Sequence, residues 1–185
     1  MRFHLLGLAH TRTTKDYLSC AFTQKIYKLS RMLTDKGHEV IHYGAEGADV
    51  PCEKVVTVPE EVFQRCYGDY NWHREHFKYS DNDEAMQAHT ANCIRGINLR
   101  KRPDDFILST FGNGQKPIFD GVDLRLKVES GIGYSGTFAP FRVFESQTWM
   151  HYIWGRYGTP NDDGIWYDVV IPNSFDPDDF PLVKH

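Results

Sequence analysis

Short β-rich runs alternate along this chain with longer stretches of helical composition, and few folds accommodate that pattern. The first 44 residues contain a predicted strand at residues 2–8, a predicted helix after it, and a second predicted strand at residues 38–44. A strand, a helix and a further strand in this order form the opening unit of a parallel α/β sheet. We therefore expect an α/β fold.

The helix of this first unit has the most regular pattern in the sequence. Five apolar residues recur at spacings of three and four, as on one face of an amphipathic helix. They are Leu18, Phe22, Ile26, Leu29 and Leu33. Thr13 or Thr14 is the expected N-cap, and Gly37 is placed where a C-cap belongs. The helix is thus expected to begin directly after the first loop.

The rest of the chain continues the alternation. The further expected strands are residues 54–58, 104–110, 123–130 and 165–171, and the expected helices are residues 59–67, 81–100 and 141–157. Six strands separated by helices or long connections predict a Rossmann-like, doubly wound, mostly parallel sheet with helices on both faces. We assign residues 1–172 to this domain. Residues 173–185, rich in Pro and Asp, are expected to start an interdomain linker.

Size and composition exclude several classes of protein. With 185 residues, 41% of them hydrophobic, the chain has the size of one domain. Its net charge of −4 argues against nucleic acid as a partner. Its four cysteines form no C-x-x-C pair, which favours neither a zinc site nor a disulfide framework. No run approaches the roughly 20 apolar residues of a membrane span, and no signal peptide is evident. We expect a cytoplasmic protein.

Three loops are expected at the carboxyl ends of the strands, where doubly wound sheets bind ligands. They are residues 7–14, 112–117 and 129–140. The candidate substrate-binding residues lie in or beside these loops: His10, Thr11, Thr13, Asn113, Gln115, Glu129, Gly133, Tyr134, Arg142 and Glu145. Amides at a helix start favour anions and hydroxyls, and glycines leave backbone amides accessible. A threonine that only caps the helix, a purely conformational glycine loop and an exposed Arg142–Glu145 ion pair are the structural alternatives.

The remaining motifs predict no catalytic residue, metal or cofactor. The spacing of Gly131, Gly133 and Gly136 matches a dinucleotide fingerprint, but that motif belongs to the first strand-to-helix turn and not to a late loop. His73 and His76 lack an evident third metal ligand. Neither a G-x-S-x-G nucleophile motif nor a P-loop occurs.

Two stretches resemble the amino-terminal half of GT-B glycosyltransferases of the glycogen-synthase-like, retaining kind. Residues 36–40 (KGHEV) are similar to the opening of the second strand in the acceptor domain of that family. Residues 170–180 (VIPNSFDPDDF) are similar to the segment where the acceptor domain ends and the chain crosses into a donor-binding domain. The segments DDFILSTFG and GIGYSGTFAPFRVFES also resemble a phage or bacterial glycosyltransferase-like group.

The resemblance implies that the chain is the acceptor-binding half of an enzyme that moves a sugar from a nucleotide-sugar donor to an acceptor hydroxyl. Its partners would be an acceptor glycan or another hydroxyl-bearing substrate, and a C-terminal donor domain in the same chain or a separate one. No metal is implied, and the half alone is expected to be inactive. The implied acceptor surface comprises His10, Thr13, Asn113, Glu129, Tyr134 and Arg142.

The sequence also departs from the pattern of that family. Members commonly have a glycine pair in the first loop and a histidine after the fourth strand, whereas here Leu8 and Ala9 follow Gly7, and Asn113 and Gln115 take the later place. Asn113 can donate a hydrogen bond comparable to that of the histidine. A non-catalytic binding or regulatory module and a Rossmann-type oxidoreductase are the competing hypotheses.

Overall fold

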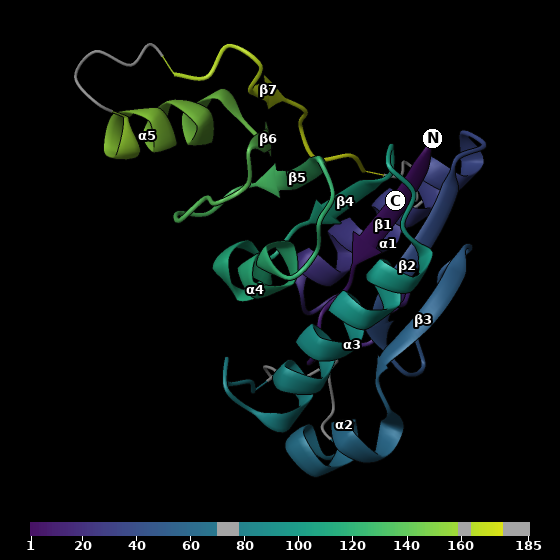
Figure 1. Ribbon diagram of the computed structural model, residues 1–185. Helices are drawn as coiled ribbons and strands as arrows, with labels where there is room; N and C mark the ends of the chain where they lie inside the picture. Colours follow the sequence, from purple (N-terminus) through teal and green to yellow (C-terminus); the bar gives the residue numbers. More distant parts are fainter. Residues whose placement is uncertain (70–77, 159–163, 176–185) are drawn as a thin grey trace, which may run out of the picture.

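The computed structural model describes residues 1–69, 78–158 and 164–175, which contain one seven-stranded sheet (Figure 1). The strands are β1 (Arg2–Leu6), β2 (Glu39–Ala45), β3 (Glu53–Val58), β4 (Phe106–Ser109), β5 (Leu126–Ile132), β6 (Phe141–Phe144) and β7 (Val169–Val170). Their order is β3-β2-β1-β4-β5-β6-β7, and all neighbours are parallel. From β1 the chain adds β2 and β3 on one side of the sheet and then β4 to β7 on the other side. This reversal of direction between β1 and β4 confirms the predicted Rossmann-like, doubly wound fold.

Helices cover both faces of the sheet. They are α1 (Ala21–Asp35), α2 (Glu60–Tyr67), α3 (Glu84–Arg100), α4 (Lys116–Asp120) and α5 (Gln147–Tyr157), and a 3₁₀ turn, η1 (Gly112–Gln115), precedes α4. In Figure 1, α3 and α4 lie in front of the strands and α1 lies behind them. Right-handed crossovers require this division, because the connections from β1 to β2 and from β4 onward run in opposite directions across the sheet.

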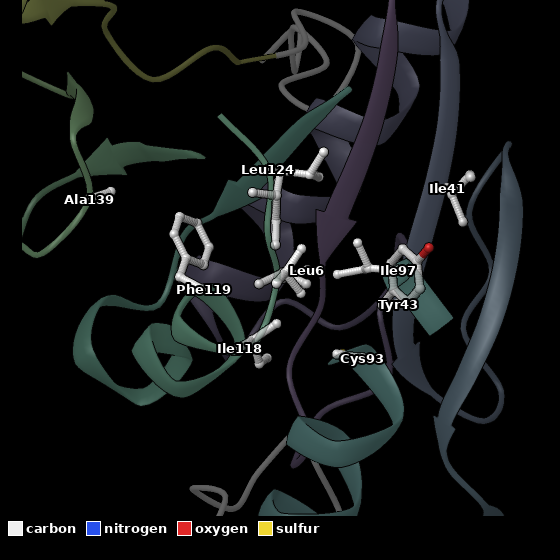
Figure 2. Packing of buried hydrophobic residues seen from close by; sticks show 11 residues of the cluster. Leu6, Ile41, Tyr43, Cys93, Ile97, Ile118, Phe119, Leu124 and Ala139 are labelled. Carbon is white, nitrogen blue, oxygen red and sulfur yellow. The ribbon is translucent and has the colours of Figure 1, made fainter. Parts of the chain in front are cut away.

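The strands next to the switch point are buried on both faces. Leu5 packs in the cluster with α1, while the adjacent Leu6 packs with Ile97 of α3 on the opposite face. Figure 2 shows Leu6 close to Ile97 and Tyr43, with Ile118 of α4 below it. Burying one such side chain contributes about 1.5–3 kcal/mol, so this double packing is a main source of the stability of the fold.

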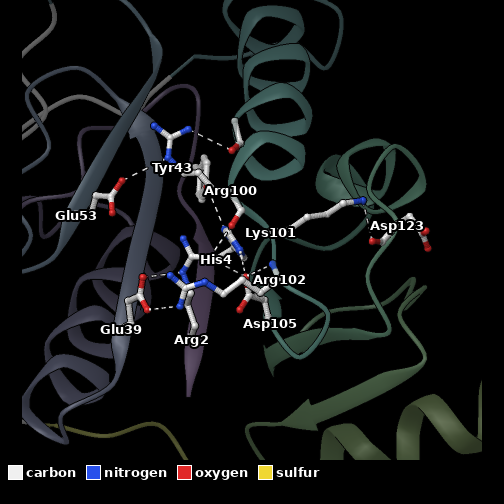
Figure 3. A network of polar contacts seen from close by, with 11 residues as sticks. Arg2, His4, Glu39, Tyr43, Glu53, Arg100, Lys101, Arg102, Asp105 and Asp123 are labelled. Carbon is white, nitrogen blue, oxygen red and sulfur yellow. Dashed lines mark hydrogen bonds and ion pairs between the residues drawn. The ribbon is translucent and has the colours of Figure 1, made fainter.

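A buried polar network closes the amino-terminal edge of the same strands (Figure 3). His4 lies 2.9 Å from a carboxylate oxygen of Asp105 through Nε2 and 2.8 Å from the Tyr43 hydroxyl through Nδ1. The same Asp105 oxygen accepts hydrogen bonds from Arg2 (3.1 Å) and from the Arg102 backbone amide (2.8 Å). Burial raises the pKa of Asp105, but these donors outweigh it and hold the pKa below its usual value. The network therefore stabilises the edge opposite to the predicted loops.

The predicted start of the first helix is wrong, although its apolar face is correct. Helix α1 begins at Ala21, and Leu18 is 74% exposed. Thr13 is not a cap, because its carbonyl accepts the amide of Asp49 and its hydroxyl contacts the His42 side chain. Long-range contacts of this kind hold residues 7–20 as a loop. The four later face residues pack as expected in the α1 cluster: Phe22, Ile26, Leu29 and Leu33.

The predicted helix over residues 141–157 is also wrong in its first part. Phe141–Phe144 forms β6, and α5 begins only at Gln147, with the Ser146 hydroxyl accepting the amide of Trp149 as the N-cap. The sheet therefore has seven strands and not six. The β-branched and aromatic residues of this run pair with β5, a contact that local periodicity does not report. The last strand is shorter than predicted, at two residues.

The predicted helices at residues 59–67 and 81–100 are confirmed, with small shifts at their first residues. Helix α2 spans Glu60–Tyr67, and α3 starts at Glu84 with the Asp83 side chain accepting the Met86 amide. Residues 70–77 lie outside the described part of the chain, as do residues 176–185 of the expected linker. The division into a domain and a linker stays a prediction.

Candidate functional site

The three predicted loops meet at the carboxyl edge of the sheet. The side-chain amide of Gln115, after β4, donates to the Gly7 carbonyl after β1 at 2.7 Å. The loop after β5 reaches the loop after β4, since a Cβ placed on Gly136 would lie 2.7 Å from the Asn113 amide nitrogen. Loops that are far apart in sequence thus form one cluster beside the switch point.

The polar residues of the first loop are buried inside this cluster. The ring of His10 is fully buried and stacks on the Tyr79 ring, with the centroids 4.4 Å apart. Burial lowers the pKa of His10 to about 4, so the ring is neutral at pH 7. The hydroxyls of Thr11 and Thr23 lie 2.6 Å apart, and Thr13 lies 3.1 Å from Nε2 of His42. These residues shape the loop from within and do not face solvent.

Two further histidines of this region were not predicted as site residues. Burial lowers the pKa of His42 to about 3 and that of His89 to about 4. The ring of His42 occupies the space where Gly7 and Gly44 would carry a Cβ, so both glycines are required by close packing. His89 of α3 bonds the Thr57 hydroxyl at 2.7 Å. In the sequence, the signal for His42 was its place in a predicted strand, at a position where an apolar residue is expected.

Gln115 holds the loop after β4 in place. Its carbonyl oxygen accepts the Ser109 hydroxyl at 2.8 Å and the backbone amides of Thr110 and Phe111 at 3.2 and 3.3 Å, while its amide group bonds Gly7. The residue is only 2% exposed. Gln115 therefore positions its neighbours, among which Asn113 is exposed at the surface.

Glu129 holds the loop of residues 129–140, the glycine loop, in the same way as Gln115 holds the loop after β4. Its fully buried carboxylate accepts the backbone amides of Phe138 and Ala139 at 2.8 and 3.0 Å and the Tyr134 hydroxyl at 3.2 Å. Burial raises the pKa of Glu129 despite these donors, and burial beside this carboxylate also raises the pKa of the Tyr134 phenol. Tyr134 therefore stays protonated and donates to Glu129.

Arg142 and Glu145 do not pair with each other, so the alternative of an exposed ion pair between them is wrong. Arg142 forms a two-pronged ion pair with Asp168, at 3.0 and 2.5 Å. Glu145 accepts Lys25 at 2.6 Å and Asn173 at 3.0 Å. Burial opposes ionisation of Glu145, but the hydrogen bonds from these two residues lower its pKa overall. Both pairs tie β6 to distant segments of the chain.

The predicted site residues therefore divide into two groups. Five are buried and engaged in holding the loops: His10, Thr11, Thr13, Gln115 and Glu129. Five are exposed or half-buried: Asn113, Gly133, Tyr134, Arg142 and Glu145. Only residues of the second group are accessible to a ligand in this conformation.

The described residues contain no group of three or more His, Cys, Asp and Glu side chains arranged to hold a metal ion. His73 and His76 lie outside this part of the chain. No helix within residues 1–69, 78–158 and 164–175 is both long and apolar enough to cross a membrane.

The sheet order and the loop cluster define the chain as an α/β protein of the Rossmann-like class. Comparison with family profiles, with curated proteins and with solved structures finds no match to this chain. The fold class is thus established by the strand order, and the activity has to be inferred from the site.

Proposed function

We propose that this chain is the acceptor-binding half of a glycosyltransferase that uses a nucleotide-sugar donor. The proposal rests on the resemblance of residues 36–40 and 170–180 to the GT-B family. The observation that best supports it is the gathering of three loops at the switch point, with Asn113 exposed among glycines. Ligands of doubly wound sheets bind at this place.

In this proposal Asn113 and the glycine loop form the acceptor surface. The amide of Asn113 can donate to one sugar hydroxyl and accept from another, and the ring of the half-buried Tyr134 lies beside Gly112, the preceding residue. Gln115 and Glu129 hold these groups before substrate arrives, which reduces the entropy lost on binding. A donor domain in the same chain or a separate one would bind the nucleotide sugar and close over the cleft, excluding water.

The proposal assigns no catalytic residue and no metal to this chain. Charge of the departing diphosphate would be balanced by helix amino termini and basic side chains of the closed cleft. A cytoplasmic location is part of the proposal, and the four free cysteines of the chain are compatible with a reducing compartment.

A non-catalytic binding or regulatory module is the second candidate. It is favoured by the internal use of His10, Thr13, Gln115 and Glu129, which leaves few polar groups at the loop cluster for chemistry. Both candidates predict a ligand at the same loops, but only the first requires a donor domain.

The acceptor site can be tested by saturation-transfer NMR with a panel of mono- and disaccharides. Asn113→Ala is expected to weaken saccharide binding about 5-fold, since one neutral hydrogen bond contributes about 1 kcal/mol. Asn98→Ala is the matched control, because Asn98 is exposed on α3 and bonds the Gly121 carbonyl away from the loops. Equal binding by both variants would place the saccharide elsewhere and overturn the assignment.

Two further measurements separate the candidate functions. Nicotinamide cofactor binding, followed by fluorescence, would favour an oxidoreductase and contradict the glycosyltransferase proposal. Reading the coding DNA beyond codon 185 distinguishes the other two: a second α/β pattern in frame supports the enzyme, and a stop codon without a partner gene supports the module.

A further inference from the structure

Glu145 lies where three distant parts of the chain meet. It follows the last residue of β6, and its backbone amide donates to the carbonyl of Ile132, at the end of β5, over 3.1 Å. Its side chain is 21% exposed and contacts helix α1, the glycine loop and residues 171–175. These last five residues are called the C-terminal segment below. A single carboxylate thus touches all three parts.

One oxygen of this carboxylate joins α1 to the C-terminal segment. Oε2 accepts a hydrogen bond from Nζ of Lys25 at 2.6 Å and another from the side-chain amide of Asn173 at 3.0 Å. Hydrogen bonds to an ionised group are stronger than those between neutral groups. The position of Asn173 therefore depends on the position of the carboxylate.

The other oxygen lies against the glycine loop. A Cβ placed on Gly133 would overlap Oε1 of Glu145, so the carboxylate occupies the space that a side chain would take. Lys25 adds a second attachment, because its Nζ also donates to the Gly131 carbonyl at 3.0 Å. Groups in such close contact cannot move independently. A displacement of the glycine loop at Gly133 must therefore displace the carboxylate.

The C-terminal segment buries little of its own surface. All five of its residues are exposed. Its backbone is joined to the end of β6 by the Ile171 amide, which donates to the Phe144 carbonyl at 2.9 Å, directly before Glu145. Segments with few buried contacts open locally at a low cost in free energy. Loss of the bond between Asn173 and Glu145 should therefore suffice to loosen this segment.

We propose that Glu145 is a switch residue that couples the glycine loop to the C-terminal segment. A group that enters the space beside Gly133 displaces the carboxylate, breaks its bond to Asn173 and releases the segment. Coupling between two sites is reciprocal, so release of the segment also loosens the glycine loop. The proposal rests on contacts within this chain and does not depend on the glycosyltransferase assignment.

Gly133→Ala tests the coupling from the side of the glycine loop. The φ angle of Gly133 lies outside the left-handed region, so alanine alters the contact with Glu145 and leaves the backbone conformation accessible. Exchange of the Ile171 amide, followed by NMR, is expected to become at least about 5-fold faster, because the segment loses a hydrogen bond to a charged group. Gly155→Ala is the matched control, since a Cβ at this position of α5 meets open space. Unchanged exchange at Ile171, or an equal rise in the control, contradicts the proposal.

Asn173→Ala tests the coupling from the side of the segment, and it serves as the second variant if circular dichroism shows that Gly133→Ala does not fold. Asn173 is exposed, so its truncation leaves the core intact. Exchange of the Glu145 amide, which bonds Ile132, is expected to rise about 2- to 5-fold. Ser174→Ala, at the next exposed position, should leave it unchanged. The absence of a rise in Asn173→Ala would refute the coupling.

The double variant distinguishes coupling from two independent effects. Asn173→Ala by itself should accelerate exchange of the Ile171 amide, because it removes the same hydrogen bond. If the loop acts on the segment only through Glu145, adding Gly133→Ala should then have no further effect at Ile171. If the two accelerations multiply instead, the loop and the segment respond independently and the proposal is wrong.

Discussion

Strands β1, β2 and β4 are buried on both faces, whereas β5, β6 and β7 are packed closely on only one. Four of the five residues of β1 and three of the four of β4 are buried, but β6 has one buried residue of four. Two buried histidines lie on the first group, His4 on β1 and His42 on β2. One half of the sheet thus provides most of the closely packed core, and the other half is packed less closely on one face.

The largest expected effect of this difference is a loss of stability in acid. Burial gives His10, His42 and His89 pKa values of about 4, 3 and 4, below the roughly 6.5 of an unfolded histidine. As the pH falls below 6.5, the unfolded chain binds protons that the folded chain does not. The free energy of unfolding should therefore fall by roughly 2 kcal/mol per histidine between pH 8 and pH 5, as measured by urea unfolding.

The His42→Gln variant sharpens this expectation. It should be less stable at pH 8 but should lose less stability on acidification, by the roughly 2 kcal/mol expected from His42, because that titrating group is removed. His38→Gln, at a partly exposed position before β2, is the control for the effect of the substitution itself. Glu129 acts in the opposite sense: its raised pKa contributes stability that is lost as the pH rises through it. A flat profile from pH 8 to pH 5 would show that the buried histidines are not held neutral.

Core truncations compare the two halves directly. Ile107→Ala, at a fully buried position on β4, should cost about 3 kcal/mol because a cavity remains. Val143→Ala, at a half-buried position on β6, should cost about 1 kcal/mol or less. Chemical denaturation measures both. If the two variants lose equal stability, the open face is covered in solution and the comparison fails.

The smallest expected effect concerns the unsatisfied hydroxyl between the two halves. Thr110→Val removes a buried group without a hydrogen-bond partner and should be neutral or should stabilise by up to about 1 kcal/mol. Ser109→Ala is the contrast, because the Ser109 hydroxyl donates to Gln115 and its loss should cost about 1 kcal/mol. Destabilisation by Thr110→Val would mean that its hydroxyl has a partner in solution.

Much of the fold was predictable because it is encoded locally. The apolar face from Phe22 to Leu33, the Asp83 cap of α3 and the buried run of β4 each follow from residues close together in sequence. The alternation of strands and helices then predicted the parallel sheet and placed three loops at its carboxyl edge. Local patterns of this kind need no information on distant contacts.

The parts that were predicted wrongly depend on partners far away in the chain. Helix α1 starts late because Thr13 bonds groups at positions 42 and 49, and β6 forms because it pairs with β5. Lys25 and Glu145 are 120 residues apart, and no pattern near either residue specifies their pairing.

Sequence alone gave this protein its class of fold and the edge at which ligands are expected, because periodicity and crossover handedness follow from the backbone. Only the packed structure decided which polar side chains are buried and hydrogen-bonded inside the loops and which are exposed to a ligand. The physical reason is that burial and hydrogen-bond partners are properties of the assembled chain: Gln115 and Asn113 stand two positions apart, yet one is enclosed and the other is exposed.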